Sequence, residues 1–406
     1  MKHETRIKDA ANAAIEAATL ILCDDAPHLH DPVVGPIYQT SLFTFKDYAE
    51  MQKTFAGEAQ GYIYSRVGNP TVHDFERRIA ALEQAETARA FSSGMAAISA
   101  TVLSIVQAGD RIVAVRNCYG DAYRFFEKLL PRFAITVDYV DGSDAEAVEA
   151  ALPGAKLLYL ESPSSMVFEL QDIARLAQSA RSQGITTVID NSWATPIFQK
   201  PITHGVDLVL HSASKYIGGH SDTVAGVVAG SKALIARINE LTHPFLGAKL
   251  SPLEAFLLIR GLRTLPFRIK RHMDSTLMLA ERLRAHGHVT KIHHPVYSNH
   301  PGRATLSGFT GLFTFEVDDA IDIPRFADLL KFFRLGVSWG GHESLIVPVA
   351  ASLAQTPGVN SFDRFSVSPR AIRLHVGLED PEMLWADLEK ALAKSVKTTS
   401  TREENQ

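Results

Sequence analysis

The chain has 406 residues, of which 46% are hydrophobic and 21% charged, and this is more material than one compact core of ordinary size holds. Its formal net charge of −4 offers no electrostatic footprint for nucleic acid or an anionic membrane. Cys23 and Cys118 cannot form a disulfide framework, residues 1–9 lack the apolar core of a signal peptide, and no apolar run is long enough to span a bilayer. We therefore expect a cytoplasmic protein of two domains.

The N-terminal part predicts a helix followed by an extended arm. Residues 10–22 are rich in Ala, Ile and Leu, and residues 27–36 contain Pro and Gly. An arm ahead of the first strong helix is typical of a segment that packs on a neighbouring subunit. That helix begins at Asn69-Pro70, because Asn is a good N-cap and Pro suits the first helical position. The apolar residues of one face follow at Val72, Phe75, Ile79 and Leu82.

From about residue 90 to 230, short apolar runs alternate with helical segments such as residues 172–183. The runs are uniformly apolar, which indicates strands buried on both faces of a mostly parallel sheet. Ligands bind such sheets at the carboxyl ends of the strands. The predicted strands are Arg111–Val115, Ile135–Val140, Leu157–Leu160, Thr186–Ile189, Leu208–Leu210 and Ala225–Val228.

The C-terminal part predicts a smaller α+β domain. Ser251 and Glu254 form a capping-box pattern, and the helix that they open runs toward Gly261. Pro266 breaks or kinks the helical pattern beyond it. Further elements are expected at residues 269–285 (helix), 312–317 and 372–376 (strands), and after Asp380-Pro381 (helix). We predict an N-terminal arm (1–65), a large ligand-binding domain (66–264), a C-terminal substrate domain (265–397) and a disordered tail (398–406).

Lys215 is a candidate nucleophile. It follows an apolar strand in the window Ser212-Ala-Ser-Lys-Tyr-Ile-Gly-Gly-His. Burial lowers the pKa of a lysine from about 10.4 and frees its amine for attack on an aldehyde. Ser212 and Ser214 beside it are suited to bind a phosphate. On this window alone, however, an exposed lysine in a turn is the better explanation.

Asp190 changes that balance. It ends the apolar strand Thr-Thr-Val-Ile-Asp, 25 positions before Lys215. A carboxylate at such a strand end can keep the pyridine nitrogen of pyridoxal 5′-phosphate (PLP) protonated, which makes the ring an electron sink. An N-cap or turn aspartate is the common alternative. The pairing of Asp190 with Lys215 is more specific than either residue.

Two further windows fit an anionic cofactor and substrate. Gly94 and Met95 open a helix whose free N–H groups suit a phosphate. Arg373 lies on an apolar strand, where its guanidinium either grips a carboxylate or forms a structural ion pair. The 16 histidines show no convincing metal-ligand spacing, including His28 and His30, so we expect no metal.

Together these windows resemble the Cys/Met-metabolism family of PLP-dependent enzymes, over about residues 35 to 395. Members include cystathionine β-lyase, cystathionine γ-synthase, cystathionine γ-lyase and methionine γ-lyase. The resemblance implies the PLP-dependent transferase fold (fold type I, aspartate-aminotransferase-like, α/β). It also implies a homotetramer of dimers with shared active sites.

The resemblance also carries residue roles. Tyr64 and Arg66, in Tyr-Ser-Arg-Val-Gly-Asn-Pro-Thr, match a pair that reaches the cofactor phosphate from a neighbouring subunit. Asp190 matches the partner of the pyridinium, and Lys215 matches the Schiff-base lysine. Tyr119 matches the tyrosine that stacks on the ring and assists catalysis. The matches to the phosphate site are Gly94, Met95, Ser212 and Ser214, and those to the substrate-carboxylate site are Ser338 and Arg373.

The choice among family members depends on a few positions. Trp339 and Ser165 favour a bacterial cystathionine β-lyase, because γ-cleaving relatives usually have a smaller aliphatic residue at the first position and most relatives have Asn at the second. Val337 departs from both patterns, since γ-acting cystathionine enzymes tend to have Glu there and the closest β-lyases an aromatic residue. The window around Tyr64 has the form common to γ-type members.

We therefore predict α,β-elimination of L-cystathionine to homocysteine, pyruvate and ammonia, as in methionine biosynthesis. The alternatives are a γ-acting relative, which includes O-acylhomoserine sulfhydrylase, or a PLP-binding regulatory protein. The chain has no appended DNA-binding module, which counts against the last of these.

Overall fold

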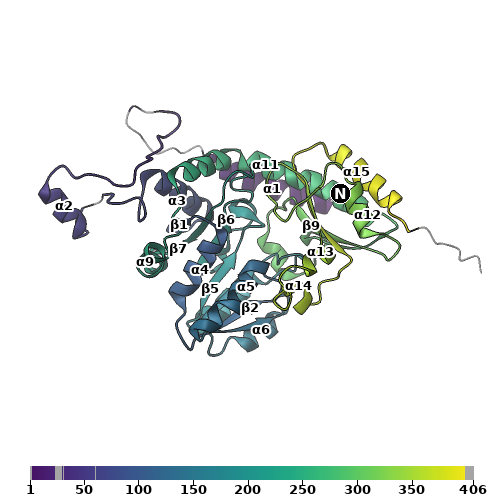
Figure 1. The fold of residues 1–406 in the computed structure, drawn as a ribbon, viewed down its shortest axis with the longest axis horizontal. Coiled ribbons are helices and arrows are strands. Elements are labelled where there is room, and N and C mark those ends of the chain that lie inside the picture. The colour runs from purple at the N-terminus through teal and green to yellow at the C-terminus, as the bar shows by residue number, and fades with distance from the viewer. Residues whose placement is uncertain (1, 23–29, 31, 60, 398–406) are drawn as a thin grey trace, which may run out of the picture.

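The computed structural model describes residues 2–22, 30, 32–59 and 61–397. Two β-sheets stand side by side, joined by a long helix, and an extended N-terminal segment projects from the body (Figure 1). Within the described residues, no helix is both long and apolar enough to cross a membrane. The predicted disordered tail lies outside the described residues.

The larger sheet has seven strands in the order β1-β7-β6-β5-β4-β2-β3. Strands β2 to β6 run parallel, and β7 is antiparallel to both β1 and β6. This confirms the mostly parallel α/β sheet. The strands are β1 (Thr87–Phe91), β2 (Arg111–Val115), β3 (Thr136–Val140), β4 (Leu157–Glu161), β5 (Thr186–Asp190), β6 (Leu208–Ser212) and β7 (Gly226–Gly230).

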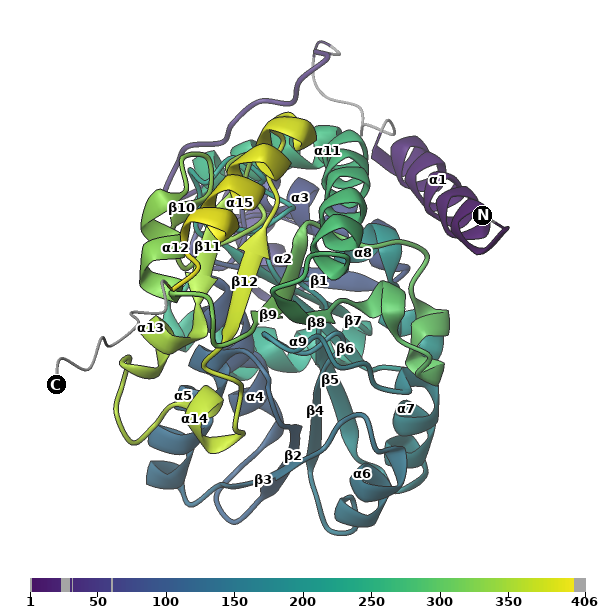
Figure 2. The same ribbon diagram turned by 90° about the vertical axis from the view of Figure 1, so that its right-hand side faces the viewer.

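Helices cover both faces of this sheet (Figure 2). Val228 on β7 packs in one apolar cluster with α4, while Val227 and Ala229 pack in another with α3. Alternate residues of a strand point to opposite faces, so α3 and α4 lie on opposite sides. The helices of this part are α3 (Pro70–Glu83), α4 (Gly94–Ile105), α5 (Gly120–Lys128), α6 (Ala145–Ala151), α7 (Ile173–Ser182), α8 (Thr195–Phe198), α9 (Lys232–Leu241) and α10 (His243–Leu246).

The start of α3 agrees with its prediction. The Asn69 side chain accepts a hydrogen bond from the Thr71 N–H, and Pro70 occupies the first turn. The four predicted apolar residues Val72, Phe75, Ile79 and Leu82 are all buried. The helix is thus fixed by its cap at one end and by its apolar face along its length.

The smaller sheet has five strands in the order β10-β11-β12-β9-β8. Its strands are β8 (Val289–His293), β9 (Leu312–Val317), β10 (Arg334–Leu335), β11 (Leu345–Pro348) and β12 (Ala371–His375), and its helices are α12 (Ile323–Leu329), α13 (Val349–Leu353), α14 (Ser361–Arg364) and α15 (Pro381–Lys394). Short 3-10 helices occur at Leu130–Phe133, Pro201–His204, Pro295–Tyr297 and Pro301–Thr305.

One prediction in this region was wrong. The helices expected on either side of Pro266 form a single helix, α11 (Pro252–Arg284), with the predicted capping box at Ser251. Leu262, Leu265 and Ile269 are fully buried in the same core, so both halves are held in line although the proline lacks an N–H. The boundary predicted between residues 264 and 265 therefore falls inside α11, and the division into domains stays a proposal.

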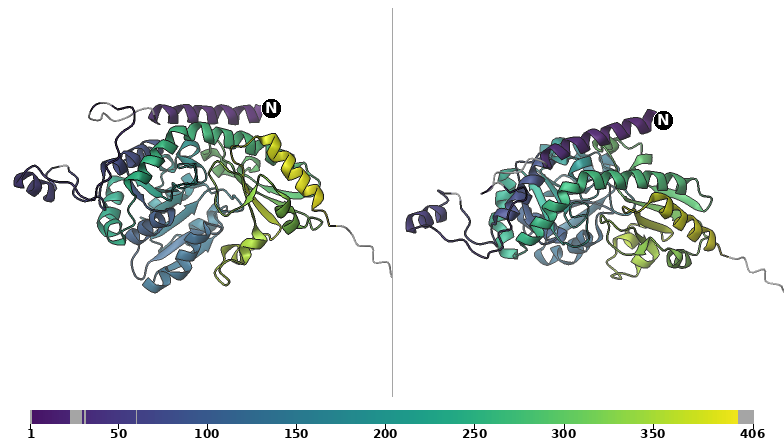
Figure 3. Two further views of the ribbon diagram at one scale, coloured as in Figure 1. Left: turned by 45° about the horizontal axis from the view of Figure 1, so that its top comes forward. Right: turned by 90° about the horizontal axis from the view of Figure 1, so that it is seen from above.

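The N-terminal part has two contrasting pieces. Helix α1 (Lys2–Leu22) lies along α11 and packs against it and α3 (Figure 3). Helix α2 (Tyr48–Phe55), by contrast, stands away from the body on an extended segment (Figures 1 and 3). It has no buried residue. Apolar side chains of this segment are exposed at Val33, Val34, Ile37, Tyr38, Leu42, Tyr48, Met51, Phe55, Ile63, Tyr64 and Val67.

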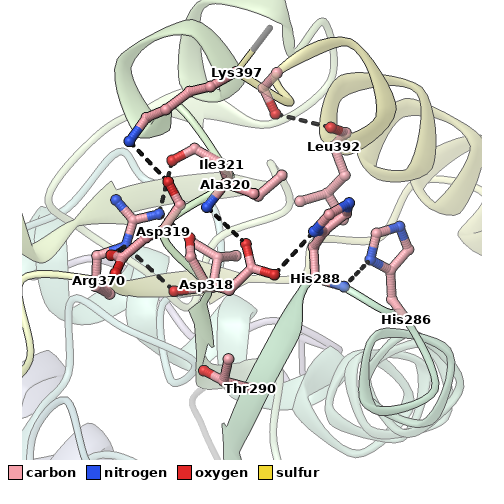
Figure 4. Close-up of polar contacts among 12 residues, drawn as sticks. His286, His288, Thr290, Asp318, Asp319, Ala320, Ile321, Arg370, Leu392 and Lys397 are labelled. Atoms are coloured by element: carbon pink, nitrogen blue, oxygen red, sulfur yellow. Dashed lines mark hydrogen bonds and ion pairs between the residues drawn. The ribbon is translucent and has the colours of Figure 1, made fainter. Parts of the chain in front are cut away.

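The C-terminal end of the described chain is tied to the smaller sheet (Figure 4). The Lys397 Nζ donates to the Asp319 carbonyl at 2.8 Å, and Ile321 forms a β-bridge with Val396. Arg370 donates to the carbonyls of Asp318 and Ile321 from the start of β12. These bonds fix the end of α15 against the strands of the smaller sheet.

Candidate active site

A cavity of about 400 Å³ lies at the carboxyl ends of β4, β5 and β6. Residues of the smaller sheet and of the loop between β10 and β11 close its far side. Among the residues predicted from the sequence, those that line it are Gly94, Met95, Tyr119, Ser165, Asp190, Ser212, Ser214, Lys215, Ser338, Trp339 and Arg373. The structure thus brings together predicted residues that are up to 279 positions apart in the sequence.

One end of the cavity is built for an anion. Helix α4 begins there, and its Ser93 cap uses only the Ala96 N–H, which leaves the first N–H groups of the helix facing the cavity. A Cβ atom on Gly94 would lie 3.0 Å from the side chain of Ser212, and one on Gly226 would lie 2.2 Å from the Ser93 carbonyl oxygen. Glycine at both positions therefore allows the strand ends and the helix to meet closely.

Asp190 stands at the other end, as the last residue of β5. Its carboxylate accepts a hydrogen bond from the Ser192 N–H at 2.9 Å. Burial raises the pKa of Asp190, while the Ser192 hydrogen bonds and the nearby His211 and Lys215 lower it. A cation placed against this carboxylate would favour its ionised form.

Lys215 lies between these two ends, in the loop that joins β6 to β7. Its Nζ donates to the Ser338 Oγ at 2.9 Å and lies 5.3 Å from the centroid of the Trp339 ring. Burial, and then the charge of Arg373, lower the pKa of Lys215 to about 8. The amine is therefore neutral in about a tenth of molecules at pH 7, far more often than an ordinary lysine.

Gly340 makes the contact between this lysine and the loop of the smaller sheet possible. It adopts a φ of +88°, and a Cβ there would lie 2.7 Å from the Tyr216 nitrogen and 2.9 Å from the Lys215 Cα. Only glycine accepts both the conformation and the close approach. Ser338 and Trp339 directly precede Gly340, and its close approach holds both of them against Lys215.

Arg373 reaches the cavity from the middle of β12, where it pairs with Val347 and Thr314 on the neighbouring strands. Its Nη2 donates to the Val337 carbonyl oxygen at 2.8 Å. Burial lowers the pKa of Arg373 to about 10, so the guanidinium keeps its charge. With no carboxylate within salt-bridge distance among the described residues, this charge is available to an anionic ligand.

Tyr119 forms one wall of the cavity and precedes α5. Its hydroxyl donates to the Asp121 carboxylate at 2.8 Å, and 40% of the residue is exposed. Burial of the phenol, and then Asp121, raise the pKa of Tyr119 well above its usual range. The phenol is therefore protonated and able to donate.

Tyr64 and Arg66 do not line the cavity. Both are exposed on the projecting segment, where the Arg66 guanidinium lies 5.5 Å from the Tyr64 ring centroid. Conversely, several cavity residues were not predicted, among them Ser93, Glu161, Trp193, Thr223 and Glu343. Glu161 carries the same sequence signal as Asp190, because it too is an acidic residue directly after an apolar strand.

The fold and cavity define a class of protein. An α/β sheet carries a partly buried lysine between an anion site and a strand-end carboxylate, and these groups fit the aldehyde, the phosphate and the pyridine nitrogen of PLP. The protein is a PLP-dependent enzyme of fold type I. Its sequence matches the model of the Cys/Met metabolism PLP-dependent enzyme family over residues 19–393. The chain belongs to this family, and its cofactor is pyridoxal 5′-phosphate.

Relatives with different activities are similar to this chain to nearly the same degree. L-methionine gamma-lyase of Pseudomonas putida is 38% identical over 91% of this chain and 96% of its own. Cystathionine beta-lyase of Lactococcus lactis subsp. cremoris (strain MG1363) is 38% identical over 88% of this chain and 93% of its own. Among solved structures, cystathionine gamma-lyase from Lactobacillus plantarum superposes with a TM-score of 0.85 at 34% identity, covering 94% of this chain and 99% of that one.

Proposed function

We propose that the protein is a carbon–sulfur lyase that binds a sulfur-containing amino acid in the cavity around Lys215. The observation that carries this proposal is the position of the Lys215 amine between Asp190 and Arg373. When bound, PLP withdraws electrons from the Cα atom of an amino acid. The protein's own residues then have to hold the amino acid, remove its Cα proton and exclude water.

In this proposal the anion site at α4, with Gly94, Met95, Ser212 and Ser214, holds the phosphate. Asp190 pairs with the pyridine nitrogen, and Lys215 is the attachment lysine. The Lys215 amine takes the Cα proton of the substrate, which its lowered pKa allows near neutral pH. Tyr119 would cover the cofactor ring and position the leaving sulfur, with its phenol held protonated against Asp121.

The substrate carboxylate is assigned to Arg373 and Ser338. A planar guanidinium offers two parallel hydrogen bonds to a carboxylate. The Ser338 hydroxyl already contacts the Lys215 amine, so a carboxylate bound there has its Cα close to that amine. Orientation of this kind lowers the barrier of proton removal.

The predicted β-lyase and the γ-acting alternative differ in which carbon–sulfur bond of the substrate is cleaved. The relatives support the γ-acting alternative better than the predicted β-lyase. Proteins named methionine gamma-lyase or cystathionine gamma-lyase are at least about as similar to this chain as those named cystathionine beta-lyase. We therefore propose γ-cleavage first. β-Elimination is the second candidate. Cleavage at Cγ needs a second proton to be removed, from Cβ, and Trp339 beside the Lys215 amine restricts the movement of that amine toward Cβ.

A product assay separates these two candidates. With L-cystathionine, we expect 2-oxobutyrate and cysteine from γ-cleavage, whereas β-elimination releases pyruvate and homocysteine. L-methionine is the matched second substrate, because it carries its sulfur at Cγ and can be cleaved there only. Pyruvate as the sole oxo acid, with no turnover of methionine, would contradict γ-cleavage, and absence of any oxo acid would contradict the lyase proposal.

We further propose that a second copy of the chain supplies Tyr64 and Arg66 to the cavity. The two residues lie outside their own cavity, on a segment whose apolar side chains have no cover within the described chain. Deleting residues 32–59 should therefore give a smaller particle in analytical ultracentrifugation and weaken the binding of PLP, with the control being the intact chain at the same concentration. An intact chain that sediments as a monomer with full activity would contradict this assembly.

A further inference from the structure

Glu161 lines the active-site cavity, yet the proposed function gives it no role. It is the last residue of β4 and only 8% exposed. In the parallel pairing of β4 with β5, Glu161 stands directly opposite Asp190. The cavity therefore contains two carboxyl groups at adjacent strand ends, of which one faces the pyridine nitrogen in the proposed function.

The Glu161 side chain holds the backbone of Tyr119. Its Oε2 accepts the Tyr119 N–H at 2.7 Å. Tyr119 is the residue before α5, and its own side chain does not cap that helix. The bond to Glu161 thus holds the Tyr119 N–H at the entrance to the helix, while the Tyr119 carbonyl accepts the Tyr123 N–H of the first turn.

A second bond joins the same two loops. The Ser165 N–H donates to the Asn117 carbonyl oxygen at 2.8 Å. Asn117 has a φ of +60°, a conformation that asparagine tolerates better than most residues. Backbone groups on either side of Cys118 therefore join the loop after β2 to the end of β4 and the loop that follows it, and Glu161 provides the contact nearer to the tyrosine.

The protonation state of Glu161 follows from its neighbours. Burial, and then the charge of Asp190, raise the pKa of Glu161 well above its usual range, against hydrogen bonds from Tyr119 and Ser165 that lower it. Two neighbouring carboxylates in a buried site do not both ionise readily. These effects favour the neutral form of Glu161, and a carboxyl oxygen accepts the Tyr119 N–H whether or not the group is ionised.

We propose that Glu161 is a positioning residue of this site, which orients Tyr119 over the cofactor by accepting the Tyr119 N–H, a role that needs an acceptor oxygen and not a negative charge. This inference rests on the proposed function, because it takes Tyr119 as the residue that covers the ring. It assigns no contact between Glu161 and the substrate.

The test compares Glu161→Ala with Glu161→Gln in the holoenzyme. Glu161→Ala removes the acceptor, so we expect the circular dichroism of the bound cofactor to decrease and the Kd for PLP to rise by about tenfold, the effect of one lost hydrogen bond. Glu161→Gln keeps an oxygen in the same place without a charge. It should restore the dichroism and bring the Kd back to within about threefold of the wild type.

Glu169→Ala is the matched control. Glu169 belongs to the same loop and accepts a hydrogen bond from the Asn117 side chain at 3.2 Å, but it does not line the cavity. It should leave the dichroism unchanged. Thermal unfolding of each apoprotein shows whether a variant is folded. If Glu161→Ala does not fold, Glu161→Gln still tests the proposal.

Two results would overturn the inference. One is a folded Glu161→Ala protein with wild-type dichroism and Kd, and the other is a Glu161→Gln protein as defective as Glu161→Ala, which would mean that the negative charge is what matters. Both are distinct from failure of the proposed function, in which the wild-type protein itself would show no cofactor dichroism that substrate alters.

Discussion

Lys215→Ala abolishes both the visible absorbance of the protein-bound cofactor and turnover, which we expect to fall by at least about a thousandfold. The variant lacks the only amine that the cavity presents among its lining residues. It loses the group that attaches PLP and the base for the Cα proton at the same time. Absorbance of the purified protein after gel filtration, and release of oxo acid, measure the two effects separately.

Lys215→Arg and Lys200→Arg are the controls. The first keeps a cation beside Ser338 and Trp339, but an arginine does not deprotonate and cannot attack an aldehyde, so it should be as inactive as alanine. Lys200 is also a lysine with a pKa lowered by burial, yet its Nζ donates to the Pro196 carbonyl oxygen away from the cavity. Loss of absorbance in Lys200→Arg but not in Lys215→Ala would contradict the assignment.

The pH dependence of cofactor uptake is a further readout of the same amine. Attachment needs the neutral form, whose fraction rises with pH and is one half at the pKa. The rate of absorbance gain on adding PLP to the wild-type apoprotein should therefore rise with a midpoint at about 8, the lowered pKa of Lys215, rather than near the 10.4 of an ordinary lysine.

Arg373→Gln is the second change with a large expected effect. It removes a guanidinium whose charge no carboxylate balances among the described residues, and with it the proposed grip on the substrate carboxylate. Charged hydrogen bonds contribute about 1.5–3 kcal/mol each, so kcat/KM should fall by about a hundredfold or more, mainly through KM. Steady-state kinetics with the better substrate of the product assay give this ratio.

Arg373→Lys refines the result. A lysine keeps the charge but not the planar fork, so its kcat/KM should lie between those of the wild type and Arg373→Gln. Arg325→Gln is the control, because Arg325 is exposed on α12 and its loss should not change kcat/KM. Cofactor absorbance should persist in all three variants, because none of them removes the attachment lysine. An unchanged KM in Arg373→Gln would place the carboxylate elsewhere.

The sequence predicted the parts of this protein that depend on local patterns. Uniformly apolar runs located six strands of the larger sheet to within about two residues, and the caps at Asn69 and Ser251 located two helix starts. It did not predict β1, in which Thr87 and Arg89 alternate with small residues, or three strands of the smaller sheet, namely β8, β10 and β11. Helix α11 was divided in two, because the core contacts that hold Pro266 in line are between distant residues.

In the candidate site, too, local patterns were predictable and contacts between distant residues were not. Asp190 and Lys215 were specific only as a pair, because each window alone favoured an ordinary turn residue, whereas Ser338 and Trp339 depended on the family resemblance. The conformation of Gly340 that brings them to Lys215 is a tertiary contact and has no local signature. Glu161 had a usable signal, an acidic residue after a buried strand, but that pattern was interpreted at Asp190 alone.

Helix α11 has a consequence for the dimensions of the active site. His272, halfway along it, lies 5.2 Å from the Tyr216 ring and 5.3 Å from the His375 ring, centroid to centroid. Tyr216 follows Lys215 in the chain, and His375 is two positions beyond Arg373 on β12. The His272 ring therefore separates the strand that carries Arg373 from the loop that carries Lys215, and a change in its size would alter the distance between the proposed carboxylate-binding group and the proposed base.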